Sequence, residues 1–154
     1  VFYIGGTKVG AMIGKAVVFT GMKAPKYFFT IVKRHGALLA KGRMLGIQFD
    51  TLFTDNLYFK VSQHAINMAV RICDIFKKHG IAIAYDSPTN QQFVVLPKKL
   101  YEALSQKVAF EIWERKSDEE IVCRFVTSWA TKEEELDGLD RILTALCGAC
   151  RDED

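Results

Sequence analysis

The sequence lacks the features that membrane-spanning chains and disulfide-rich secreted domains require. None of its apolar runs approaches the roughly 20 residues that a membrane-spanning helix needs. The first residues also lack the basic-then-apolar layout of a signal peptide. Four cysteines among 154 residues are too few and too scattered to build a disulfide framework. We therefore expect a cytoplasmic protein with reduced thiols.

The sequence also has little excess of charge of either sign. The formal net charge is +3 with 25% charged residues, and no run of Lys or Arg alternates with aromatic residues as on a nucleic-acid-binding surface. We expect no nucleic-acid partner. The apolar content is sufficient for the core of one ordinary domain, and the composition gives no sign of disorder.

A metal-binding pattern is missing as well. Cys147 and Cys150 form a CxxC, but no second pair or nearby histidines accompany it as a zinc site would require, and it does not open a helix as thioredoxin-like motifs do. We expect neither a metal nor a redox site. His64 lies one residue from the apolar stripe of a predicted long helix, so we interpret it as a packed or interface histidine rather than a catalytic one.

Periodicity predicts mixed α/β structure in two parts. Before Gly80 we expect strands at 2–4 and 16–20, a helix from Lys23 to Gly36 with Pro25 in its first turn, and helices over 39–53 and from about 56 to 79. After Gly80 we expect strands at 81–85, 93–96, 109–113 and 121–127, a helix over 97–106, and a closing helix from Thr131 with Glu134 completing its capping box. We place a domain boundary between residues 55 and 56, with a small α+β domain over 56–154.

Lys8 stands in the string FYIGGTKVGAM, where glycines and a threonine follow a short apolar run. Glycines let a backbone turn approach a phosphate closely, and a lysine in a partly enclosed site has a lowered pKa and a more nucleophilic amine. Residue chemistry alone leaves two interpretations open. Lys8 is either an ordinary surface lysine or a nucleophile beside a phosphate site.

Arg124 is the second anomaly, because it lies in the middle of the predicted strand IVCRFVTSW. The period of two places its guanidinium on the face of Val122 and Val126, where an apolar group would be expected. One explanation is an edge strand whose arginine reaches solvent or a carboxylate such as Glu111. The other is an anion-binding arginine, whose planar fork suits a carboxylate.

Four segments, in their order along the chain, carry a resemblance to a known family. FYIGGTKVGAM, VKRHGALLAKGRMLGIQF, VSQHAINMA and RFVTSWAT are similar to the threonine aldolase and β-eliminating lyase family, pyridoxal phosphate enzymes of the aminotransferase-like fold. The resemblance covers nearly the whole chain. It implies the C-terminal part of that fold, with the end of the large cofactor domain over 1–55 and the small C-terminal domain after it.

The resemblance also implies roles for individual residues. Lys8 would hold pyridoxal 5'-phosphate, Thr7 and Arg43 would contact its phosphate, and Arg124 would bind the α-carboxylate of an amino-acid substrate. For Arg43 a solvated helix-face arginine is an equal alternative, because Lys41 stands nearby. Because the family's ring-stacking residue and its Asp that pairs with the pyridine nitrogen precede the lysine, we expect an N-terminal part to be missing here.

The implied reaction is retro-aldol cleavage of a threonine-like β-hydroxy-α-amino acid to glycine and an aldehyde. Two alternatives stay open: a β-eliminating lyase of the same superfamily, and an inactive C-terminal portion that acts only in dimerisation or assembly. We expect a homo-oligomer, or association with the missing N-terminal part, and weak cofactor binding without activity for the 154 residues alone.

Overall fold

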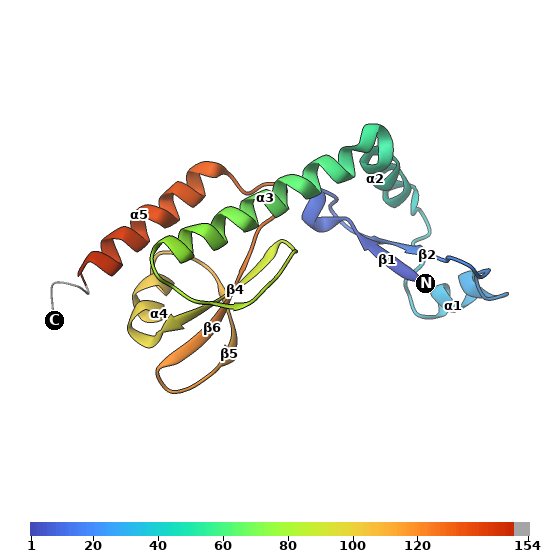
Figure 1. Ribbon diagram of the computed structural model, residues 1–154. Helices are drawn as coiled ribbons and strands as arrows, with labels where there is room; N and C mark the ends of the chain where they lie inside the picture. Colours follow the sequence, from blue (N-terminus) through green and yellow to red (C-terminus); the bar gives the residue numbers. More distant parts are fainter. Residues whose placement is uncertain (150–154) are drawn as a thin grey trace. The chain divides into compact units, whose positions relative to one another are not determined.

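The computed structural model describes residues 1–149 and divides the chain into two compact units, Val1–Ser62 and Gln63–Asp154 (Figure 1). The long helix α3 (Leu57–Lys78) belongs to both units, since it begins before Ser62 and continues after Gln63. The chain has the mixed α/β composition predicted from its sequence, with two small antiparallel sheets. The domain boundary that we place between residues 55 and 56 stays a prediction.

The first unit contains a two-stranded antiparallel sheet and two helices. β1 (Phe2–Gly5) pairs with β2 (Lys15–Val18), which confirms the two predicted strands, and the helices are α1 (Phe28–Arg34) and α2 (Arg43–Phe53). A short 3-10 helix, Thr54–Asn56, leads into α3 at the predicted position. Its buried core is small and consists of Val9, Ala11 and Leu52, with Tyr58 and Val61 packed against them.

Two helices of this unit begin later than predicted. Pro25 precedes α1 instead of lying in its first turn, and its carbonyl accepts a hydrogen bond from the Phe28 N–H at 2.9 Å. A proline disfavours helical conformation in the residue before it, which excludes the predicted start at Lys23. The hydrogen-bonded turn over residues 25–28 then precedes the helix, which begins at Phe28. The helix expected from Leu39 begins at Arg43, because Gly42 takes the N-cap position and glycine has low helix propensity.

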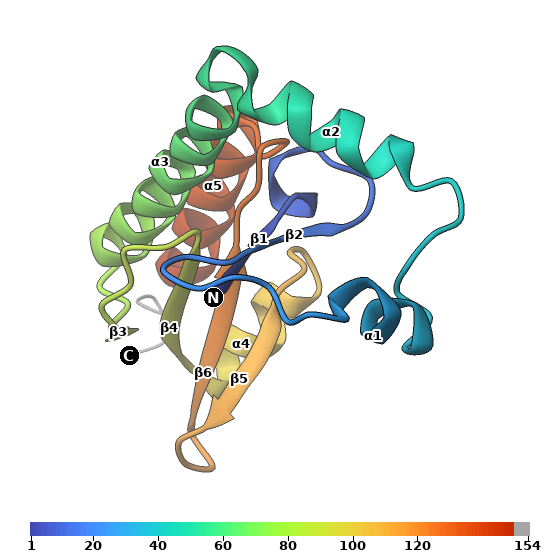
Figure 2. The same ribbon diagram turned by 90° about the vertical axis from the view of Figure 1, so that its right-hand side faces the viewer.

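The second unit is a four-stranded antiparallel sheet with helices against one face (Figure 2). The strands are β3 (Ile83–Tyr85), β4 (Gln91–Pro97), β5 (Glu111–Arg115) and β6 (Glu120–Val126), in the spatial order β3-β4-β6-β5. The helices are α4 (Lys98–Ser105), α5 (Glu133–Ala149) and most of α3. These elements match the predicted ones in type and order, and the predicted ends differ from the observed ones by at most two residues.

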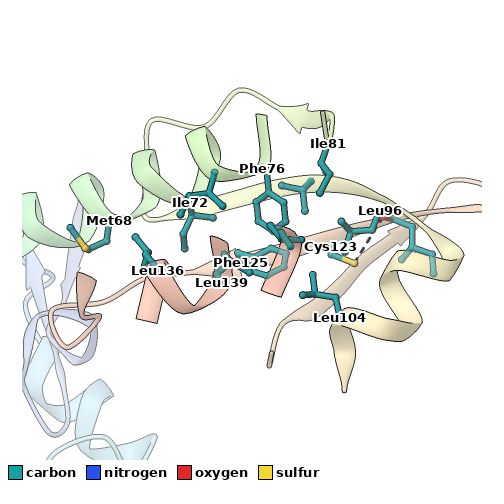
Figure 3. Close-up of a cluster of buried hydrophobic side chains, with 14 residues drawn as sticks. Met68, Ile72, Phe76, Ile81, Leu96, Leu104, Cys123, Phe125, Leu136 and Leu139 are labelled. Atoms are coloured by element: carbon teal, nitrogen blue, oxygen red, sulfur yellow. Dashed lines mark hydrogen bonds between the residues drawn. The ribbon is translucent and has the colours of Figure 1, made fainter. Parts of the chain in front are cut away.

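The core of this unit lies between the helices and one face of the sheet (Figure 3). Alternate residues of β4 and β6 point inward, among them Leu96, Cys123 and Phe125. Phe76 of α3 is fully buried, and its ring centroid lies 4.8 Å from that of Phe125. Burial raises the pKa of the Cys123 thiol to about 11, so this cysteine is an inert core residue at neutral pH.

Ion pairs join α3 to α5 along their exposed sides. Arg71 pairs with Glu133 at 3.1 Å and also with Asp137, while Lys78 and His79 each lie 2.7 Å from an oxygen of Asp140. The hydrogen bonds from Lys78 and then His79 lower the pKa of Asp140 below its ordinary value. These contacts connect the C-terminal half of α3, and His79 just after it, to the first half of α5.

The predicted capping box of the closing helix is one residue out of place. Glu135, not Glu134, reaches back to the chain before α5 and accepts a hydrogen bond from the Lys132 N–H at 2.9 Å. The Thr131 hydroxyl accepts instead from the Ser128 N–H, also at 2.9 Å. Because Thr131 is occupied in that turn, the helix begins two residues later, at Glu133.

Candidate functional site

Lys8 lies on a tight turn between the two strands of the first unit. The turn is a 3-10 helix, Thr7–Val9, closed by hydrogen bonds from the Val9 and Ala11 N–H groups to the Gly6 carbonyl at 3.1 and 2.9 Å. Val9 is buried, whereas Thr7 and Lys8 are exposed. The turn therefore anchors itself through Val9 and presents the hydroxyl of Thr7 and the amine of Lys8 to solvent.

Two glycines of this turn are required by its geometry. A Cβ added at Gly6 would lie 2.6 Å from the Cβ of Ala11, a separation that real Cβ atoms essentially never show. Gly10 ends the turn with φ at 98°, a left-handed conformation that glycine adopts without a steric cost. The glycines predicted to shape a phosphate-binding turn thus do shape a turn around Lys8.

Gln48 of α2 and Tyr58 of α3 fix the chain after and before this turn through hydrogen bonds. The Gln48 side chain accepts a hydrogen bond from the Met12 N–H at 2.7 Å and donates to the Met44 carbonyl at 3.1 Å. The Tyr58 hydroxyl donates to the Gly5 carbonyl at 3.4 Å. Sequence reasoning missed Gln48; a lone glutamine among the apolar residues of a predicted helix was the only signal for it.

Three polar side chains predicted to hold the cofactor, Thr7, Lys8 and Arg43, have no partners in the described part of the chain. Within residues 1–149, the Lys8 amine, the Thr7 hydroxyl and the Arg43 guanidinium form no hydrogen bond or ion pair. Arg43 is the first residue of α2, where a positive charge is unfavourable to the helix dipole. Thr7 and Lys8 therefore share one turn, and Arg43 begins the helix that contacts that turn.

Arg124 lies in the second unit, on the sheet face opposite the helices. Its Nη1 donates to Gln91 Oε1 at 3.1 Å, its Nη2 pairs with Glu111, and its guanidinium carbon lies 5.3 Å from the centroid of the Trp113 ring. The arginine side chain is 27% exposed and the Glu111 side chain 66% exposed. The carboxylate of Glu111, which is exposed to solvent, therefore pairs with Nη2 of the half-buried Arg124 guanidinium.

The structure corrects one part of the interpretation of Arg124. β6 is not an edge strand but lies between β4 and β5, with Arg124 opposite Phe93 on one side and Glu111 on the other. The carboxylate partner considered from sequence, Glu111, is present. The Arg124 Nε is buried and has no hydrogen-bond partner among the described residues.

Aromatic side chains continue along the same sheet face. Phe93 lies edge-on to Trp113 at a centroid distance of 5.1 Å and to Tyr85 at 5.6 Å. The Tyr85 hydroxyl donates to Glu114 at 2.7 Å, and that carboxylate raises the pKa of the phenol. Sequence reasoning missed Gln91 and Trp113 because their contacts depend on strand register and on a bulge between Ile112 and Glu114.

His64 and the CxxC cysteines are residues for which we expected no catalytic, metal or redox role. His64 Nε2 lies 2.8 Å from the Thr131 carbonyl oxygen, so this histidine is packed against the turn before α5. Cys150 of the CxxC lies outside the described residues. Within residues 1–149 no three His, Cys, Asp or Glu side chains converge as metal ligands, and no helix is long and apolar enough to cross a membrane.

Comparison with known proteins identifies the relatives of this arrangement. No family model and no curated protein sequence matches the chain. Among solved structures, threonine aldolase from Leishmania major matches with a TM-score of 0.89 and 35% sequence identity, over 95% of this chain. The matched region spans 43% of the Leishmania chain and fits its C-terminal part. The chain therefore belongs to the threonine aldolase family, to whose C-terminal part it corresponds.

Proposed function

We propose that this chain is part of a pyridoxal phosphate-dependent aldehyde-lyase that cleaves a threonine-like β-hydroxy-α-amino acid to glycine and an aldehyde. The observation that carries the proposal is the exposed amine of Lys8 on a glycine-shaped turn, without a partner within residues 1–149, in a chain with 35% identity to a threonine aldolase. A β-eliminating lyase is the alternative within the same superfamily.

The residues of the lysine turn fit this cofactor. A primary amine without a partner is the group that can hold pyridoxal phosphate covalently, and the Thr7 hydroxyl beside it is a hydrogen-bond donor for a phosphate. Gly6 lets the turn pack closely on Ala11, where a Cβ would clash, and so shapes the turn that presents both groups. Arg43, or Lys41 in its place, would add a positive charge toward the phosphate. When bound, the cofactor supplies an electron sink that stabilises negative charge at the substrate Cα.

Arg124 would bind and orient the amino-acid substrate. A guanidinium fixed by Gln91 and Trp113 can hold an α-carboxylate in one direction, which determines which bond at Cα is set for cleavage. Cleavage of the Cα–Cβ bond then releases the aldehyde as the β-hydroxyl loses its proton. In β-elimination the α-proton is removed instead, and the β-substituent leaves.

Product analysis tests the reaction. The purified protein, together with any polypeptide that co-purifies with it, is loaded with pyridoxal phosphate and incubated with threonine. We expect glycine and acetaldehyde in equal amounts. Formation of 2-oxobutanoate and ammonia would instead support the β-eliminating alternative.

We expect Arg124→Ala to weaken amino-acid binding far more than cofactor binding. Loss of a charge-assisted carboxylate contact in a partly desolvated site costs about 2 to 4 kcal/mol. Titration of the cofactor-loaded protein with threonine, followed by the change in cofactor absorbance, measures this. Arg124→Lys should recover only part of the affinity, because an ammonium lacks the planar fork. Unchanged threonine affinity in Arg124→Ala would assign the residue to the sheet alone.

We also infer an assembly role, from the apolar surface of the first unit. Only three of its apolar residues are buried in a core, whereas many large ones are exposed. Exposed apolar residues of this unit include Phe2, Tyr3, Met12, Ile13, Tyr27, Phe29, Met44, Ile47 and Phe59. Surfaces of this kind mark contacts with further polypeptide. The occupant we propose is another part of the same enzyme, either a second copy or residues that this chain does not include.

Light scattering during gel filtration tests the assembly role. We expect the 154-residue polypeptide to elute as a species larger than a monomer, because water contact with these side chains is unfavourable. We expect its affinity for pyridoxal phosphate to be weak. A clean monomer that binds the cofactor tightly and turns over threonine would contradict the inference.

A further inference from the structure

Arg124 already has a carboxylate partner inside the sheet. Glu111 extends from β5 and pairs with Nη2, while Nη1 donates to Gln91 and the buried Nε has no partner among the described residues. A substrate carboxylate that forms two parallel hydrogen bonds with the guanidinium must either share Nη2 with Glu111, against the repulsion of two negative charges, or displace Glu111 from it. Resting on the proposed function, we propose that Glu111 is an internal competitor of the substrate carboxylate for Arg124.

The two members of this ion pair are held unequally. Arg124 is 27% exposed and keeps two contacts that do not involve Glu111: the hydrogen bond to Gln91 at 3.1 Å and the Trp113 ring at 5.3 Å. Glu111 is 66% exposed and has no other bonded partner among the described residues. Removing Glu111 therefore leaves the guanidinium in place.

The exposure of Glu111 sets how strongly it competes. An ion pair with a solvent-exposed carboxylate contributes little, because water screens both charges and the long side chain loses freedom. Glu111 is therefore weak enough to be displaced by a substrate and strong enough to reduce the substrate's affinity. Its effect is confined to ligands with a carboxylate.

The sheet provides a matched control in Glu114. This residue lies three positions along the same strand, pairs with Val122 of β6 in the register, and accepts its hydrogen bond from Tyr85. No contact joins it to Arg124 among the described residues. Glu111→Gln and Glu114→Gln remove the same charge from the same strand. A difference in ligand affinity between the two variants therefore comes from the contact with Arg124 and not from the change in net charge.

The experiment is a titration of the whole chain, without cofactor, with glycine as the probe. The side-chain Nε–H signal of Arg124 and the indole N–H signal of Trp113 are followed by NMR in the unsubstituted chain, Glu111→Gln, Glu114→Gln and Arg124→Ala. Glycinamide, which lacks the carboxylate, is titrated in parallel.

We expect Glu111→Gln to bind glycine about threefold to fivefold more tightly than the unsubstituted chain, the range of an exposed ion pair. Glu114→Gln should stay within about twofold of the unsubstituted chain, and glycinamide should not distinguish the variants. Before ligand is added, the nuclear Overhauser contacts between the Arg124 side chain and the Trp113 ring should persist in Glu111→Gln, which shows that the guanidinium has not moved.

Two results overturn the inference, and they differ in what else they overturn. If glycine shifts the Trp113 signal, Arg124→Ala abolishes the shift, and Glu111→Gln binds no better than Glu114→Gln, then Glu111 is not a competitor, while the carboxylate role of Arg124 stands. If no variant gives a carboxylate-dependent shift, or if Arg124→Ala retains it, the carboxylate role itself fails, and the competition fails with it.

Discussion

Replacing Lys8 by alanine is expected to abolish covalent attachment of pyridoxal phosphate. Only an uncrowded primary amine can form and exchange the bond to the cofactor aldehyde, and Lys8 presents such an amine without a competing partner among the described residues. Borohydride reduction of the loaded protein, followed by peptide mapping, should place a pyridoxyl label on Lys8. In Lys8→Ala this labelled peptide should disappear, and in Lys8→Arg as well, because a guanidinium stays protonated.

Lys15 is the matched control for this labelling. It lies on β2, paired with Gly5 in the register, and is also exposed, with its amine 4.8 Å from the centroid of the Tyr3 ring. Lys15→Ala should leave the label on Lys8. Far-ultraviolet circular dichroism should be unchanged in Lys8→Ala, because the Lys8 side chain forms no hydrogen bond or ion pair with the described residues. A label that moves to Lys15 or Lys41 would show that the assignment of Lys8 is wrong.

The repeating parts of the fold could be predicted because burial imposes a period on the sequence. The apolar stripe from Leu57 to Phe76 identified α3, and short apolar runs identified β4 and β6. The residues at which helices begin could not be predicted as well. The starts of α1, α2 and α5 depend on Pro25, Gly42 and the Thr131 turn, and such local choices leave no periodic signal.

Residues with unusual chemistry could be selected from the sequence, but only some of their partners could. Arg124 stood out because a charge interrupts an apolar strand, and Glu111 was considered as its partner. The order β3-β4-β6-β5 and the bulge in β5 decide that Gln91 and Trp113 also reach the guanidinium. Register is set by pairing between distant segments, which a single sequence does not encode locally.

We expect Phe76→Ala to destabilise the second unit by about 3 to 5 kcal/mol, the range measured when a buried phenylalanine is truncated. Phe76 is fully buried between α3 and the sheet and contacts Phe125, so truncation leaves a cavity between the helix layer and β6. The chain has two tryptophans, Trp113 and Trp129, and both belong to the second unit. Urea unfolding followed by tryptophan fluorescence therefore reports on this unit.

Phe59→Ala is the matched control, since it removes the same atoms from the same helix. Phe59 is 60% exposed and belongs to the first unit, so its truncation creates no cavity in the second core. The fluorescence transition should then move by less than about 0.5 kcal/mol, as for other surface substitutions. Phe76→Leu, which fills most of the space, should fall between the two. Equal midpoints for Phe76→Ala and Phe59→Ala would mean that α3 does not pack on the sheet through Phe76.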